Sequence, residues 1–128
     1  MPRTRKSPAQ LASDAAATVR VLNHVTATTG AYPYPGDVDD AIQGLRILAR
    51  RLPQAISQGG AALARLAEAG SVRLDAMASA TPLDAHMTET LAAAADATQA
   101  AADLENALKR LGAYTCHLAY AEPTEASR

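Results

Sequence analysis

The feature that most constrains this fold is a pair of long stretches in which small or apolar residues recur at alternating steps of four and three. This spacing keeps one face of an α-helix turned towards a neighbouring helix, as a seam between packed helices requires. The first stretch comprises Val38, Ile42, Leu45, Ala49, Leu52, Ile56, Gly59, Leu63 and Leu66. The second comprises Leu83, Met87, Thr90, Ala94, Ala97, Ala101, Leu104, Leu108, Leu111, Thr115 and Leu118. The pattern predicts an all-α fold, an antiparallel bundle of long helices.

Start and stop signals divide the chain into three principal helices, expected at about residues 9–29, 37–69 and 82–119. Pro8 suits the first turn of a helix, because its missing N–H would be unpaired there in any case. Gly30 is expected to end the first helix. Asp37 is expected to cap the second helix, and Thr81 followed by Pro82 signals the start of the third.

Two features disturb the second helix. Pro53 removes one backbone hydrogen bond and should kink the helix near Ala49. Gly59 and Gly60 loosen it again, since each glycine costs up to about 1 kcal/mol relative to alanine. The phase of the pattern continues across both features, so we expect one bent helix. A break at Gly59–Gly60 would instead give four helices.

With 128 residues, the chain has room for one domain. The expected organisation is a disordered basic arm at residues 1–7, one helical-bundle domain at 8–121 and a polar tail at 122–128. Alanine supplies 32 of the residues, whereas Trp and Phe are absent. Alanine buries little area, at about 25 cal/mol per Å², so a lone bundle would be marginal. We therefore expect association with a partner protein or with a second copy that completes the bundle as a homodimer.

Charge and composition exclude several classes of partner. The net charge of −1 provides no overall field that would attract nucleic acid or anionic lipid. No stretch of about 18 apolar residues is present for a membrane span. The basic start lacks the apolar segment of a signal peptide, and Cys116, the single cysteine, cannot form a disulfide within the chain. The expected compartment is the cytoplasm.

No catalytic, metal or cofactor site is expected, and no small-molecule substrate. His24, His86 and His117 are scattered and belong to no recognised metal-ligand pattern. No Glu-x-x-His pair of the kind found in di-iron bundles occurs. Cys116 has neither a glycine-rich elbow nor an oxyanion loop beside it, so it is interpreted as a small apolar residue or a surface thiol. The chain is therefore predicted to be non-enzymatic.

The favoured hypothesis is a protein–protein interaction or scaffold module that acts through the patterned helix faces. The loop Tyr32-Pro-Tyr-Pro35 presents two rigid aromatic side chains, which are typical of interaction hot spots. The tyrosines would alternatively cap the end of the bundle, with the prolines stopping both helices. The candidate interaction residues are Tyr32, Tyr34, Leu45, Leu52, Leu104 and Leu108.

Two alternatives remain open. A nucleic-acid accessory protein would use the basic arm and an arginine stripe: Arg3, Arg5, Lys6, Arg46, Arg50 and Arg51. Asp37, Asp39 and Asp40 lie on the same predicted helix as the arginines, and no helix-turn-helix pattern is present, so a solvated charged face is favoured. A helical-hairpin substrate of a bacterial export system is the other alternative, weakened by the absence of a Trp-x-Gly turn.

The segment from Tyr34 to Gln58 resembles a recurring segment in small alanine-rich proteins of actinobacteria. The similarity is clearest in Tyr34-Pro-Gly-Asp-Val38 and in Arg51-Leu-Pro-Gln-Ala55. It extends more weakly over residues 32–111. The resemblance implies a helical fold and a bacterial cytosolic setting, and it adds no activity.

Overall fold

The computed structural model describes residues 4–77 and 80–123, and three α-helices account for most of them. They are α1 (Pro8–Thr26), α2 (Pro35–Glu68) and α3 (Leu83–Thr115). The described part of the chain contains no strand. The all-α fold with three long helices is therefore confirmed.

Helix α1 begins as predicted, at Pro8, and is held by a reciprocal cap. The hydroxyl of Ser7 accepts a hydrogen bond from the backbone N–H of Gln10, and the Gln10 side chain accepts one from the N–H of Ser7. The helix ends at Thr26 rather than at residue 29. Gly30, predicted as the stop, lies beyond the helix with a φ of 91°, a conformation that favours glycine.

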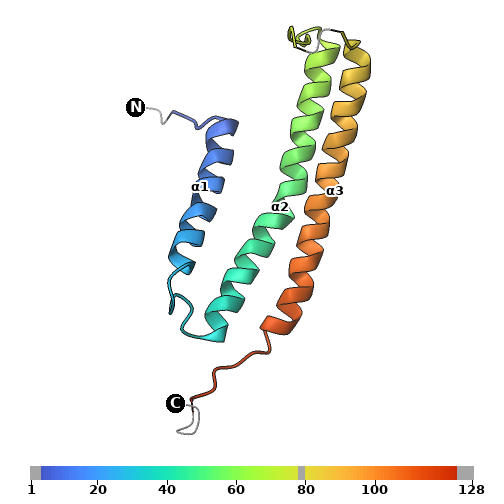
Figure 1. The fold of residues 1–128 in the computed structure, drawn as a ribbon. Helices are drawn as coiled ribbons and strands as arrows, with labels where there is room; N and C mark the ends of the chain where they lie inside the picture. Colours follow the sequence, from blue (N-terminus) through green and yellow to red (C-terminus); the bar gives the residue numbers. More distant parts are fainter. Residues whose placement is uncertain (1–3, 78–79, 124–128) are drawn as a thin grey trace.

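Helix α2 is a single continuous helix of 34 residues, about 51 Å long. It runs unbroken through Pro53 and through Gly59 and Gly60, so the four-helix alternative does not occur (Figure 1). It begins at Pro35, two residues earlier than predicted. The carboxylate of Asp37 still acts in the first turn, where it accepts a hydrogen bond of 3.2 Å from the N–H of Tyr34.

Helix α3 is shorter than predicted at both ends. Pro82 occupies the capping position, and its carbonyl accepts a hydrogen bond of 3.1 Å from the N–H of His86. At the other end the helix stops at Thr115, so Leu118 lies in the non-helical segment that follows.

The packing of the three helices is uneven. Helices α2 and α3 lie side by side and antiparallel over their whole lengths, whereas α1 stands apart on the side of α2 remote from α3 (Figure 1). No residue of α1 is buried. The long hairpin of α2 and α3 is therefore the structural unit of the molecule.

The contact between α2 and α3 is made by small residues. Ala49 is fully buried, and Ala101, Thr115 and Gly112 are the other buried residues of the described chain. No large side chain is fully buried among the described residues. Small side chains allow two helices to approach closely, but each contributes little apolar area. The hairpin consequently has a narrow core.

The predicted seams are correct in part. On α2 the buried or half-buried positions include Val38, Ile42, Leu45, Ala49 and Ile56. The predicted positions that remain exposed are Leu52, Gly59, Leu63 and Leu66. In each case the next residue along is half-buried instead, namely Pro53, Gly60, Ala64 and Ala67.

Helix α3 shows the same displacement of one residue. Its predicted positions Ala97, Leu104 and Leu111 are exposed, and Thr98, Glu105 and Gly112 take their places. A straight α-helix has 3.6 residues per turn and drifts by about 20° per heptad from a strict seven-residue repeat. Because of this drift, the contact between the helices is made by small residues one position further along, and several leucines of the predicted seams lie outside the contact.

Candidate interaction surface

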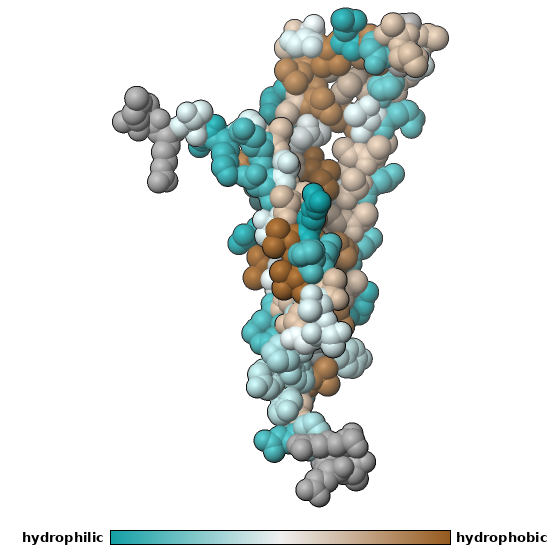
Figure 2. Space-filling model, turned by 60° about the vertical axis from the view of Figure 1, so that its left-hand side comes forward, coloured by the Kyte–Doolittle hydropathy of each residue, from teal (hydrophilic) through white to brown (hydrophobic). Residues whose placement is uncertain are grey.

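Five leucines on one side of the hairpin are exposed, and we refer to them together as the leucine face. On α2, Leu52, Leu63 and Leu66 are 36–48% exposed. On α3, Leu104 and Leu111 are 47% and 43% exposed. Alanines at positions 97, 100 and 107 of α3 lie between and beside these leucines in the same helical phase. Figure 2 shows brown and tan surface extending over much of the hairpin.

Helical geometry places all five leucines on the same side. Measured as a rotation about the helix axis at 100° per residue, each leucine lies about 40–100° from the contact position of its own helix, in the sense that points towards lower residue numbers. Because α2 and α3 are antiparallel, stripes displaced in the same rotational sense lie on one side of the pair. Residues displaced in the opposite sense, such as Arg46, Arg50 and Glu105, lie on the other side.

The opposite side of the hairpin is bridged by an ionic cluster. The carboxylate of Glu105 on α3 lies 3.4 Å from Nε of Arg46 and 3.3 Å from Nε of Arg50, both on α2. Partial burial acts to raise the pKa of Glu105, but the hydrogen bonds and charges of Arg50 and Arg46 outweigh it. The pKa of Glu105 is therefore below its ordinary value, and the carboxylate is charged at neutral pH.

Two further contacts set the register of the hairpin near the end of α3. The hydroxyl of Thr115 donates a hydrogen bond of 2.6 Å to the carboxylate of Asp39. One turn away, Gly112 lies against Gln43 so closely that an added Cβ would be 2.7 Å from Nε2 of the amide. Helix α3 thus approaches α2 through a residue that has no side chain.

A shallow open groove of about 400 Å³ lies on the side opposite the leucine face, between the middle parts of the two helices. Its lining is mostly apolar and includes Gly60, Ala94 and the 37% exposed Leu91, with Ser57 and Gln99 at its margins. A second depression of about 350 Å³ lies at the loop end, where Arg73, Asp75 and His86 are among its lining residues.

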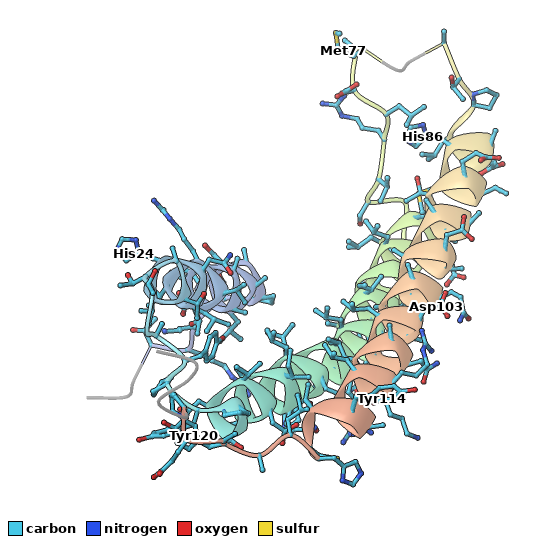
Figure 3. The ribbon with its side chains drawn as sticks, turned by 60° about the horizontal axis from the view of Figure 1, so that its bottom comes forward. His24, Met77, His86, Asp103, Tyr114 and Tyr120 are labelled. Atoms are coloured by element: carbon cyan, nitrogen blue, oxygen red, sulfur yellow. The ribbon has the colours of Figure 1, made fainter. Side chains whose placement is uncertain are left out.

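The tyrosine loop contacts the segment that follows α3. The rings of Tyr34 and Tyr120 are 5.1 Å apart between centroids and meet edge to face at 80°. Figure 3 shows Tyr120 beside the start of α2. Tyr34 is 54% exposed and Tyr32 is 38% exposed. The loop therefore packs in part against the chain itself and presents the remainder to solvent.

The other candidate interaction residues divide between the contact and the leucine face. Leu45 and Leu108 are half-buried beside the contact between α2 and α3. Leu52 and Leu104 belong to the exposed leucine face.

The residues of the nucleic-acid alternative do not form a free basic stripe. Arg46 and Arg50 are paired with Glu105, and the amine of Lys6 is 2.6 Å from the carboxylate of Asp14. Arg5 and Arg51 are exposed. Arg3 lies outside the described residues, as do parts of the predicted arm and tail.

The histidines and the cysteine are dispersed. His24 lies on α1 and His86 at the loop end of the hairpin, far from each other (Figure 3). Within residues 4–77 and 80–123, no group of three or more His, Cys, Asp or Glu side chains is placed to hold a metal ion. Cys116 is exposed at the end of α3. None of the described helices combines the length and apolar character needed to cross a membrane.

Sequence reasoning missed the residues that tie α2 to α3. The predicted seam includes neither Glu105 nor Gly112, whereas both lie in the contact. A signal was available in the sequence, because Glu105 directly follows Leu104 and Gly112 directly follows Leu111, and both leucines belong to the predicted seam. The period of a straight α-helix, in place of a strict seven-residue repeat, puts Glu105 and Gly112 in the contact.

Comparisons with protein-family models, with curated proteins and with solved structures found no match. The resemblance to the alanine-rich actinobacterial proteins stays a prediction. The surface itself must therefore carry any functional conclusion.

Proposed function

We propose that this chain is a non-enzymatic protein-interaction module that binds through its leucine face. The observation that carries the proposal is the contrast between a narrow core and an exposed apolar side. No large side chain is fully buried in the described chain, yet six leucines of the hairpin are at least 36% exposed, five of them on the leucine face and Leu91 on the opposite side. Contiguous exposed apolar surface of this kind is typical of interaction sites.

The accessible surface supports the same proposal. It measures 10262 Å², whereas a compact monomer of 13.2 kDa exposes roughly 6,400 Å². The separate helix α1 and the terminal segments contribute part of the excess. The exposed sides of a two-helix hairpin contribute the rest, because each helix is covered along one stripe only. A partner on the leucine face would supply the core that the hairpin lacks.

The bacterial cytoplasm is the setting we propose, on the basis of the sequence resemblance and composition. The non-enzymatic role is proposed from the sequence, which carries no recognised catalytic motif. The interaction would then be the activity of the protein itself.

Site-specific photo-crosslinking in the producing cells tests the proposal. A photoreactive phenylalanine derivative is placed at Leu104 or Leu111 on the leucine face, and in matched variants at Ala95 or Gln99 on the opposite side of α3. We expect adducts from the first pair and few from the second. Equal labelling from both sides, or no adduct from the leucine face, would show that this face is not the binding surface.

A further inference from the structure

The partner that fits the leucine face is indicated by charges along its two edges. On α2, Arg51, Gln58 and Arg65 recur at intervals of seven, and all three are exposed. The described chain contains no salt bridge to either arginine. In helical phase they lie along the edge of α2 that points away from α3. This edge is basic.

From Glu89 to Asp103 the corresponding edge of α3 is acidic, and the exposed Arg110 continues the same series towards the end of the helix. Glu89, Asp96 and Asp103 also recur at intervals of seven and are exposed. Figure 3 shows Asp103 projecting from the outer side of α3, away from α2. Its carboxylate accepts a hydrogen bond from the amide of Gln99 on the same helix. The leucine face is thus bordered by a basic edge on one helix and an acidic edge on the other.

The two edges match in register. The contacts Asp39–Thr115 and Gly60–Ala94 define which residues of the two helices lie at the same level along the hairpin. Continued in the same register, they place three pairs level with each other: Arg51 with Asp103, Gln58 with Asp96, and Arg65 with Glu89. Within one chain these pairs cannot meet, because they lie on opposite edges of the hairpin.

We propose that the leucine face is covered by a second copy of the chain, with α2 of each copy lying antiparallel on α3 of the other. A two-fold axis parallel to the helices produces this arrangement and keeps every residue at its own level. It brings Arg51 to Asp103 and Arg65 to Glu89 of the second copy, and by symmetry it does so along both seams. The product is a four-helix bundle, which is a usual way for two hairpins to share a core.

The alternative two-fold axis, perpendicular to the helices, is disfavoured by the same charges. It would place α2 on α2 and α3 on α3, so that basic edge met basic edge and acidic edge met acidic edge. Like charges brought together across an interface are unfavourable and select against that pairing. The charges therefore favour one orientation of the second copy.

The surface area is sufficient for such a dimer. The chain exposes roughly 3,800 Å² more than a compact monomer of its mass. Permanent homodimers bury about 2,000–5,000 Å² in total over both partners, so part of this excess from each chain would be enough. The inference rests on the proposed function and specifies its partner.

Charge reversal in the full-length chain tests this arrangement. One variant combines Arg51→Glu with Arg65→Glu, and a second combines Glu89→Arg with Asp103→Arg. Arg5→Glu with Arg20→Glu makes the same change in net charge at exposed sites outside the hairpin. The molar mass of each is measured by light scattering across micromolar concentrations at low salt, with circular dichroism to verify the helices.

We expect a wild-type dimer, and a dissociation constant that rises by roughly tenfold or more in each edge variant. A mixture of the two edge variants should form a tight heterodimer, because both of its seams then join opposite charges. The chain that carries all four edge substitutions should dimerise like the wild type. The Arg5→Glu, Arg20→Glu control should also dimerise normally.

Two results would overturn the inference. A wild-type chain that is monomeric at every concentration would show that no second copy covers the face. A dimer whose affinity ignores the edge charges would show that the copies are arranged otherwise. In either case, leucine-face photo-adducts to another protein, or to a second copy in another orientation, would leave the proposed interaction function standing.

Discussion

The hydroxyl of Thr115 on α3 donates a 2.6 Å hydrogen bond to the carboxylate of Asp39 on α2, joining residues that are 76 positions apart in the sequence. Thr115 is 8% exposed, so this is a polar link inside a contact made mainly of alanine and glycine. A short bond to a charged acceptor in a buried place specifies direction as well as distance. The hydrogen bond therefore fixes the position of α3 along the axis of α2.

Replacing this hydroxyl should destabilise the hairpin. Thr115→Val keeps the volume but leaves the Asp39 carboxylate with only the 3.5 Å hydrogen bond from the amide of Gln43, so the free energy of unfolding should fall by about 1–3 kcal/mol. Thr115→Ser retains a hydroxyl and should recover most of the loss. Urea denaturation followed by circular dichroism, at one fixed protein concentration, measures both. Equal stability of the Val and Ser variants would show that the hydrogen bond contributes nothing.

Glu105 should make stability depend on pH. Its pKa in the folded chain lies below the ordinary value of 4.5, so its ionisation favours the folded state. This stabilisation is fully present above pH 4.5 and is lost as the pH falls through the lower folded value. The difference in Tm between the wild type and Glu105→Gln should therefore be largest at neutral pH and close in acid. Glu122→Gln, beyond the end of α3, serves as the control and should show no such trend.

Glycine positions should differ in their response to a methyl group. An added Cβ at Gly59 meets nothing within 4 Å, so Gly59→Ala should raise the free energy of unfolding by about 0.5–1 kcal/mol. At Gly112 the same methyl would require Gln43 to move, and Gly112→Ala should gain less. Shortening the neighbour with Gln43→Ala should restore the gain. If Gly112→Ala alone matches Gly59→Ala, the close approach of α3 at this point is wrong.

The pair of Tyr34 and Tyr120 should show a small coupling energy. Each ring is 54% exposed, so the edge-to-face contact should contribute about 0.5 kcal/mol, the low end for aromatic pairs. A double-mutant cycle with Tyr34→Leu and Tyr120→Leu isolates this term from the loss of apolar area. Additive effects of the two substitutions would indicate that the segment after α3 does not stay on the loop in solution.

Much of the fold could be predicted from local signals. Pro8 marked the start of α1, and the continuing apolar pattern through Pro53 and Gly60 favoured the single long helix that the structure contains. The ends of the helices were predicted less accurately, because a proline after a polar residue is compatible with several capping positions. Tyr34 and Pro82 cap α2 and α3, where Asp37 and Thr81 were expected.

The partners of the contact could not be predicted by following leucines. In this hairpin the helices meet on Ala49, Ala101 and Gly112, while Leu104 and Leu111 remain exposed. A search for large apolar residues therefore identifies the exposed leucine face instead of the contact between α2 and α3. The cross-helix bonds to Glu105 and Asp39 depend on which face turns inward, and that is decided by packing between distant segments.

The narrow contact between α2 and α3 has a consequence for how substitutions are tolerated within one chain. In most cores the largest side chains are the least replaceable, because their loss leaves cavities. Here the space between the helices is set by the methyl groups of buried alanines such as Ala49 and Ala101, so enlargement is the damaging change. In a complete mutational scan of hairpin stability, the order of sensitivity would be inverted, and the least tolerant positions would be its smallest residues.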